Sequence, residues 1–337
     1  MIPPLTAIAR RMLLGGAAIA ATDVPPAFGQ ATFTGVSPHL AQRTSEANSG
    51  TVGVIAGGVD GTYIRIAADL AAVLDNGNAM RIIAMIGKGS LQNIQDIVLL
   101  RGVDIGIVQS DALAFARRNR LVPGADNLIQ YIAKLYDEEI HILARRGIAS
   151  LADLAGQVVN VDLSGSGTAM TASLLFDALD LRVRTTNDVQ DVALRKLRDG
   201  EIAAMVFVAG KPARLFAGIE ADSRLHFLTI APTPALMETY LPATLTAPDY
   251  PNLVPPEGEV ETIAVGAVMA VYAWAPGSDR YRKVARFVDA LQSRFQEFLR
   301  PPRHPKWREV NLAAQVPGWV RFDHSARPVA RRGVDGG

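Results

Sequence analysis

The residues best suited to chemistry lie in short segments rich in glycine and hydroxyl groups, each near the junction of an apolar run and a helical pattern. Backbone N–H groups at such junctions bind anions, because the first turn of a helix leaves its N–H groups unpaired and partly positive. The same composition suits a tight turn with a helix cap, so both interpretations stay open for each segment alone. Five segments have this character: GGVDGTY (57–63), GKGSLQN (87–93), VQSD (108–111), SGSGT (164–168) and VAGKPA (208–213).

Known nucleotide and catalytic motifs are missing from the sequence. GGVDGTY lacks the G-x-G-x-x-G spacing of a dinucleotide site, and SGSGT lacks the lysine of a phosphate loop. There is no G-x-S-x-G elbow and no H-E-x-x-H helix, and no histidine has a partner at metal-ligand spacing. The chain also has no cysteine, which excludes thiol chemistry. We therefore predict no catalytic residue, no metal ligand and no cofactor.

The charged residues give no sign of a nucleic-acid partner. The net charge is +1 and aromatic residues make up only 6% of the chain, so neither a basic field nor a stacking platform is indicated. The acidic run Asp137-Glu138-Glu139 is interpreted as a solvated loop. His141 lies in an apolar run and is predicted to be a core or hinge residue.

The N-terminus has the pattern of an export signal. Arg10 and Arg11 precede ten apolar or small residues, 12–21, and then prolines and small residues that suit a cleavage site. The apolar run is too short to span a bilayer. We predict a signal peptide over 1–31, and hence a periplasmic protein, while the choice between the general and the twin-arginine route stays open. An N-terminal anchor or an ordinary amphipathic helix is the alternative.

Strands and helices alternate from residue 51 onward. Apolar runs over 51–58, 79–87 and 103–111 predict strands, and the periodic segments 62–76 and 90–102 predict helices, with Ser90 capping the second. This alternation is typical of a parallel sheet with crossover helices. We therefore expect an α/β fold.

A second half repeats this order. NIQDIVLLRGVDIGIVQS resembles VQDVALRKLRDGEIAAMVFVAG, since both run from a helix through a glycine into an apolar strand. The segment 128–146 is expected to begin as a helix or a strand and to lead into a long apolar strand, and a second long apolar strand is expected within 261–276. An amphipathic helix is expected over 279–299 and a weak helix over 309–314. The proline-rich stretch 231–260 predicts a loop with a short helix.

These segments, taken in order over about 51–300, resemble the TAXI group of TRAP-transporter solute receptors. The resemblance rests on GGVDGTYIRIAADLAAVL, GKGSLQNIQDIVLLRGVDIGIVQSDA, LYDEEIHILARRGIASLADLAGQVVNVDLSGSGTAMTASLLFDALDL and LRDGEIAAMVFVAGKPA. It implies a two-lobed type II periplasmic-binding fold, in which mixed, mostly parallel sheets flanked by helices are joined by crossing hinge strands. It also implies a receptor that closes over a small organic anion or amino acid and delivers it to a TRAP-type permease.

The resemblance assigns the lobes and the ligand-binding residues. Lobe I would comprise 51–139 with 264–325, and lobe II 140–263, between a flexible leader (32–50) and a disordered tail (326–337). The first lobe would contribute Gly57, Gly58, Tyr63, Ser90, Asn93, Gln109 and Ser110. The second would contribute Ser166, Gly167, Thr168 and Gly210.

The sequence departs from the family at one segment, and other functions stay open. The group commonly has Gly-Gly-Thr-Gly-Gly-Thr-Tyr-Tyr where this chain has GGVDGTYI, so Asp60 adds an acidic group and Ile64 replaces an aromatic one. Both changes argue against a glutamate-like ligand. The alternatives to a transport receptor are an enzyme of the same two-lobed fold and a sensory ligand-binding lobe.

Overall fold

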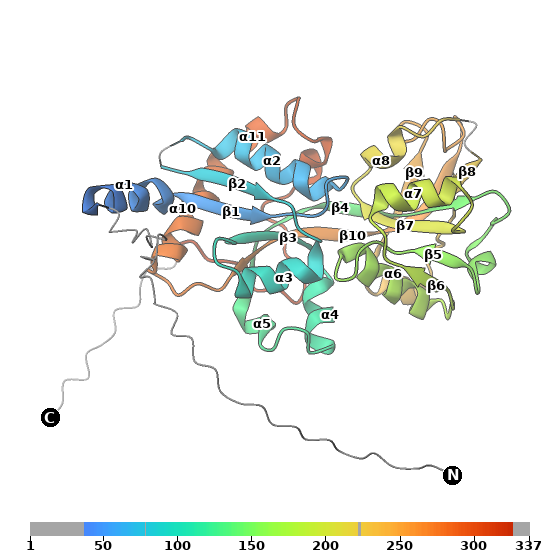
Figure 1. The fold of residues 1–337 in the computed structure, drawn as a ribbon, viewed down its shortest axis with the longest axis horizontal. Coiled ribbons are helices and arrows are strands. Elements are labelled where there is room, and N and C mark those ends of the chain that lie inside the picture. The colour runs from blue at the N-terminus through green and yellow to red at the C-terminus, as the bar shows by residue number, and fades with distance from the viewer. Residues whose placement is uncertain (1–36, 78, 222–223, 326–337) are drawn as a thin grey trace, which may run out of the picture. The chain divides into compact units, whose positions relative to one another are not determined.

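The computed structural model describes residues 37–325, except residues 78 and 222–223. The predicted signal peptide and the predicted disordered tail lie outside the described residues. Within them, strands and helices alternate along most of the chain (Figure 1).

The predicted flexible leader contains a helix. The 12-residue helix α1 (Pro38–Ser49) occupies most of the segment that was expected to lack regular structure. The Ser37 hydroxyl accepts a hydrogen bond from the Leu40 N–H, and Pro38 stands in the first turn, where its missing N–H costs nothing. The cap and the proline were therefore the local signals of this helix.

One mixed sheet runs through residues 46–325, in the order β2-β1-β3-β10-β4-β7-β5-β6 (Figure 1). Parallel pairing joins β1 to β2 and β3, and β5 to β6 and β7. The two long strands between these parallel groups run antiparallel to their neighbours. The strands are β1 (Thr51–Ile55), β2 (Arg81–Met85), β3 (Ile105–Gln109), β4 (Ile129–Arg145), β5 (Val158–Asn160), β6 (Arg184–Thr186), β7 (Ala204–Ala209), β8 (Leu225–Phe227), β9 (Leu241–Thr246) and β10 (Glu259–Tyr272).

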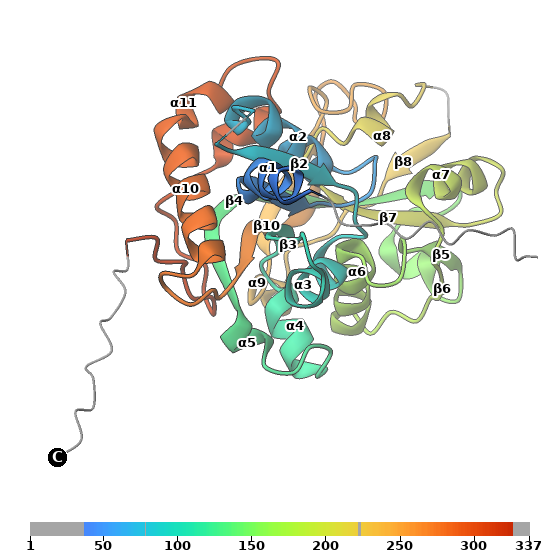
Figure 2. The ribbon, with the colours of Figure 1, turned by 60° about the vertical axis from the view of Figure 1, so that its left-hand side comes forward.

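Helices cover both faces of each half of this sheet. In the first lobe, α2, α10 and α11 lie on one side of β1–β3 and α3–α5 on the other (Figure 2). In the second lobe, α6 and α9 pack into one apolar cluster and α7 and α8 into another. The helices are α2 (Thr62–Leu74), α3 (Ser90–Leu99), α4 (Ala112–Arg118), α5 (Ala125–Leu128), α6 (Gly167–Ala178), α7 (Gln190–Arg198), α8 (Arg214–Ala217), α9 (Pro234–Met237), α10 (Asp279–Ser293) and α11 (Phe295–Phe298), with 3₁₀ turns η1 (Leu151–Leu154) and η2 (Pro305–Glu309).

Two local predictions differ from the structure. Residues 231–260 contain the strand β9 besides the short helix α9, because the LPATLT segment pairs with β10 over its whole length. No helix covers 309–314; the helical turn η2 instead begins at Pro305, where His304 accepts a hydrogen bond from the Lys306 N–H. The predicted helices over 62–76, 90–102 and 279–299 are confirmed, although the last is divided into α10 and α11.

β4 crosses from one apolar core into another. Its residues up to Tyr136 pack with the first lobe, and those from Ile140 onward pack with the second. The segment between them is Asp137-Glu138-Glu139, so this acidic run lies on a strand and not in a solvated loop. Glu138 and Glu139 are only 3% and 4% exposed. The loop interpretation was wrong because it considered the charges without the apolar residues on both sides.

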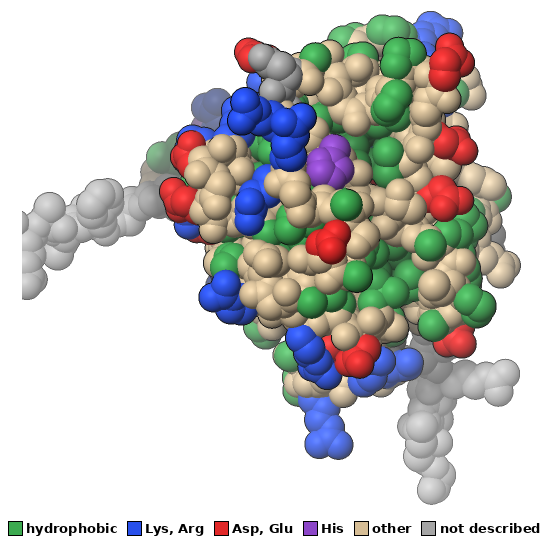
Figure 3. Space-filling view, turned by 90° about the vertical axis from the view of Figure 1, so that its right-hand side faces the viewer, with side chains coloured by type: hydrophobic (Ala, Val, Ile, Leu, Met, Phe, Trp, Pro, Cys, Tyr) green, Lys and Arg blue, Asp and Glu red, His purple; other side chains and the backbone are tan. Residues whose placement is uncertain are grey.

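The surface carries charges of both signs. On the face that Figure 3 shows, basic and acidic side chains are both present, separated by hydrophobic and uncharged groups. This distribution agrees with the near-neutral composition. In the part of the chain that the structure describes, the helices are all too short or too polar to traverse a bilayer.

The C-terminal segment is anchored on α2 by one carboxylate. Asp69 Oδ2 accepts hydrogen bonds from the His304 N–H (2.8 Å) and from the Trp307 indole N–H (2.9 Å). Trp307 is fully buried against Phe298. These contacts fix the position of the intervening residues 305 and 306, which lie close to the functional site described below.

We expect Asp69→Ala to lower the free energy of unfolding by about 2–3 kcal/mol, because two buried donors lose their charged acceptor. Urea denaturation checks this value, with Asp180→Asn as a control because the Asp180 side chain is 92% exposed. A change of less than about 0.5 kcal/mol, as is usual for surface substitutions, would show that the anchor is dispensable.

Candidate functional site

Three helix N-termini meet at one cavity, which we call the inner cavity. The first residues of α2 and α3 come from the first lobe, and the start of α6 comes from the second. Each helix has at least ten residues, so each presents unpaired N–H groups and a partial positive charge at this end. Eight of the predicted binding residues line the inner cavity: Gly57, Gly58, Tyr63, Ser90, Gln109, Ser166, Gly167 and Thr168.

The residues that precede α3 and α6 begin these two helices in different ways. At α6, the Ser166 hydroxyl accepts a hydrogen bond from the Ala169 N–H, so Ser166 is a helix cap and also lines the cavity. At α3, the residue before the helix is Gly89, whose φ of +103° favours glycine. The prediction that Ser90 caps α3 was wrong. Its hydroxyl instead accepts a hydrogen bond from the Gln109 N–H (2.9 Å) and donates one to Gln109 Oε1 (3.1 Å).

The two lobes touch around the inner cavity. The Thr62 hydroxyl accepts a hydrogen bond from the Gly210 N–H (3.1 Å) and donates one to the Gly210 carbonyl (3.3 Å). The Gln92 N–H donates to the Gly165 carbonyl (3.1 Å). These bonds join the first lobe to the second beside the inner cavity.

Gly167 permits the closest approach of the lobes. A Cβ atom at this position would lie 2.2 Å from Gln109 Oε1 and 2.6 Å from Ser90 Oγ, well inside van der Waals contact. The absence of a side chain therefore allows the start of α6 to reach the end of β3 and the start of α3.

The other three predicted binding residues do not line the inner cavity. Asn93 is fully buried, and its Nδ2 donates to the carbonyls of Ala56 (2.9 Å) and Ile107 (2.7 Å), which ties the ends of β1 and β3 together. The Ser110 carbonyl accepts a hydrogen bond from the Trp319 indole. Gly210 is bonded to Thr62 as described above.

Glu138 is a residue that the sequence interpretation missed. It lines the inner cavity, and its Oε2 accepts a hydrogen bond from the Tyr63 hydroxyl at 2.5 Å. Burial raises the pKa of Glu138 from 4.5 to about 8, although the Tyr63 hydroxyl opposes this shift. Among the described residues, none forms an ion pair with Glu138. The signal that could have located it is the run of apolar residues on both sides of the acidic group.

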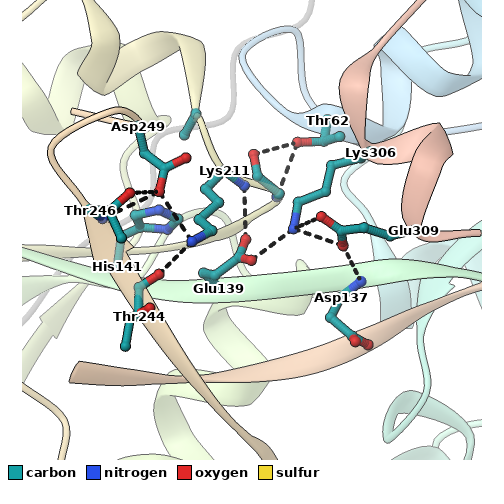
Figure 4. Close-up of polar contacts among 12 residues, drawn as sticks. Thr62, Asp137, Glu139, His141, Lys211, Thr244, Thr246, Asp249, Lys306 and Glu309 are labelled. Atoms are coloured by element: carbon teal, nitrogen blue, oxygen red, sulfur yellow. Dashed lines mark hydrogen bonds and ion pairs between the residues drawn. The ribbon is translucent and has the colours of Figure 1, made fainter. Parts of the chain in front are cut away.

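Glu139 points to the other face of β4 and is paired with basic and N–H groups (Figure 4). Its Oε1 lies 2.7 Å from Lys306 Nζ, and its Oε2 accepts a hydrogen bond from the Lys211 N–H at 2.8 Å. Burial still raises the pKa of Glu139, although Lys306 opposes this shift. Burial opposes the charge on Lys306, but Glu139 and Glu309 outweigh it and hold the pKa of Lys306 above its usual value. Glu139 thus joins the C-terminal segment to the loop after β7 in the second lobe.

His141 fits its predicted place in the core. Because the Phe207 carbonyl can only accept, His141 Nδ1 donates to it (3.1 Å), and Nε2 accepts from the Tyr250 hydroxyl (2.7 Å). Burial lowers the pKa of His141 to about 4, so the ring is neutral at pH 7.

Asp162 adds a second acidic group to the inner cavity. It precedes SGSGT and has a φ of +67°, a left-handed conformation that Asp tolerates better than most residues. Burial raises its pKa from 3.8 to about 6. Over the described ranges, no group of three or more His, Asp or Glu side chains has the arrangement of a metal centre. The cavity therefore combines helix N-termini with carboxyl groups, an arrangement suited to holding a polar organic molecule.

A family model matches residues 54–292, more than half of the sequence, and its description is NMT1-like family. The chain belongs to the NMT1-like family. The matched region begins in β1 and ends in α10, so it contains all three helix N-termini of the inner cavity.

Several solved structures are similar to this NMT1-like protein. One described as a periplasmic transporter has a TM-score of 0.50 at 13% identity, over 75% of this chain and 84% of the other. The periplasmic binding protein BugD has a TM-score of 0.48 at 14% identity, over 77% of this chain and 87% of the other. MatC from Rhodopseudomonas palustris with bound malate has a TM-score of 0.46 at 17% identity, over 77% of this chain and 94% of the other. The first of these likenesses shows a shared α/β fold, in which a mixed sheet is flanked by helices, as the sequence analysis expected.

We expect Glu138→Gln to flatten the dependence of stability on pH. The pKa of Glu138 is higher in the folded protein than in the unfolded chain, so the folded state binds more protons between about pH 4.5 and 8. The stability that this group contributes is therefore lost as pH rises through that window, by at most about 1.4 kcal/mol for each pH unit.

Unfolding by urea at pH 5, 6, 7 and 8 measures the difference between wild type and variant. Glu257→Gln is the control, because Glu257 is exposed. If the free energy of unfolding falls equally with pH in wild type and in Glu138→Gln, the burial argument is contradicted.

Proposed function

We propose that the protein is an extracytoplasmic solute receptor of the TAXI type. It binds a small organic anion or amino acid between its lobes and delivers it to a TRAP-type permease in the inner membrane. The observation that carries this proposal is the convergence of three helix N-termini, two from one lobe and one from the other, on the inner cavity.

The helix N-termini suit the negative end of such a ligand. Unpaired N–H groups of α2, α3 and α6 would donate hydrogen bonds to a carboxylate, and each helix dipole adds about 0.3–1 kcal/mol in exposed settings and more where water is excluded. The absence of nucleophile–base motifs in the sequence supports a binding role and not catalysis.

Closure would couple binding to the shape that a permease recognises. The lobes, taken as 51–139 with 264–325 and as 140–263, each supply part of the cavity wall. A ligand that contacts both lobes stabilises only the closed form, so it shifts the population toward closure about β4 and β10. An N-terminal signal peptide and a periplasmic location belong to the same proposal.

Thermal-shift screening against amino acids, mono- and dicarboxylates tests the receptor function. A ligand present at 100 times its Kd stabilises the folded state by about 2.7 kcal/mol, so at least one compound should raise the Tm by several degrees. If no compound raises the Tm and the protein turns over some substrate, the receptor function is contradicted and an enzyme of the same fold is indicated instead.

We expect Gly167→Val to reduce the affinity for the best ligand of that screen at least tenfold. The new side chain would collide with Gln109 and Ser90 only when the lobes close. The free energy of unfolding of the ligand-free protein should therefore change much less than the free energy of ligand binding. Isothermal titration calorimetry measures the affinity. Gly218→Ala is the matched control, because nothing lies within 4 Å of a Cβ atom there. Equal affinities for wild type and Gly167→Val would exclude closure at this contact.

A further inference from the structure

A second cavity, which we call the outer cavity, shares part of its lining with the inner one. Gly58, Gly61, Lys88, Asp162 and Phe207 line both cavities. A ligand whose negative end lies at the three helix N-termini can therefore extend past these residues into the outer cavity.

Three carboxyl groups from both lobes line the outer cavity. Asp60 belongs to the first lobe, whereas Asp162 and Asp191 belong to the second. Partial burial and then the negative charge of Asp191 raise the pKa of Asp60, while Arg214 opposes this shift. Closure thus brings like charges toward one another across the cleft.

A buried oxygen in the same wall also needs a donor. Gln190 is 5% exposed, and its Nε2 donates to the Val206 carbonyl at 3.0 Å, which fixes the orientation of the amide. Its Oε1 is buried and has no hydrogen-bond partner within the described structure. Because Gln190 lines the outer cavity, this unpaired oxygen belongs to a side chain in the wall that a ligand would contact.

The protein's own cations offset the charge of this wall only in part. Arg214 lowers the pKa of Asp60, but burial and Asp191 outweigh it. Lys88 lines the cavity, but its side chain is exposed to solvent. Asp191 pairs with Arg195 at 3.0 Å on the helix surface, with both side chains at least half exposed, so that pair is weak. The floor between the acidic groups is apolar and includes Val59, Leu163 and Val189.

We propose that the outer cavity selects a ligand with a cationic end, an ammonium or guanidinium group on an aliphatic chain. The ligand is then a carboxylate at one end and a cation at the other. The cation would donate to the Gln190 oxygen and relieve the repulsion among Asp60, Asp162 and Asp191, while its chain would cover the apolar floor. This inference rests on the proposed receptor function and names its ligand class.

Calorimetry with matched probes tests the inference. 5-Aminopentanoate, pentanoate and glutarate have similar lengths but carry a cation, no charge or an anion at the far end. Arginine and citrulline form a second pair that differs in charge with nearly equal shape. We expect each cationic probe to bind at least tenfold more tightly than its neutral partner, and glutarate to bind most weakly.

The double variant Asp60→Asn, Asp191→Asn should lose at least tenfold in affinity for the cationic probes and keep its affinity for pentanoate and citrulline. Asp180→Asn serves as the control, because Asp180 lines neither cavity. Preferred binding of glutarate or of the neutral probes, or an unchanged preference in the double variant, overturns the cationic ligand class and leaves the receptor function standing. Binding of no probe, and of no compound in the wider screen, overturns both.

Discussion

The structure depends on how β4 carries two buried carboxyl groups between two apolar cores. A strand that crosses from one lobe to the other must leave the first core at Tyr136 and enter the second at Ile140. An unpaired charge buried there would cost several kcal/mol. Glu139 is therefore paired with Lys306, which the Asp69 contacts hold in place from α2. The buried pair thus connects the C-terminal segment, the crossing strand and the loop after β7.

Because Glu139 is compensated on one face of β4, Glu138 is the acidic group that remains at the inner cavity on the other. It meets Tyr63 at the start of α2, so the crossing strand itself forms part of the site. The helix N-termini supply donors and partial positive charge, and the carboxyl groups supply acceptors. The site therefore offers both donors and acceptors, which is consistent with the proposed ligand that carries both kinds of polar group.

The sequence predicts most of the fold, because periodicity and glycine placement are local signals. The helices that begin at Thr62 and Ser90 follow from their apolar faces, and β10 and the second part of β4 follow from their apolar runs. Pairing partners are not local: Lys306 is 167 residues from Glu139, and no spacing rule connects them. The Thr62–Gly210 contact could not be predicted for the same reason, since it joins residues 148 positions apart. The acidic run on β4 is different, because the apolar residues on both sides of it were a local signal of burial.

The central claim is that the starts of α2, α3 and α6 hold the anionic group of a ligand together. A crystal structure of the protein with the tightest ligand from the binding screens tests it most directly. The account predicts a carboxylate in the inner cavity that accepts hydrogen bonds from backbone N–H groups of both lobes, at about 2.9 Å. A ligand bound outside this cavity, or one whose anionic group contacts a single lobe, would contradict it.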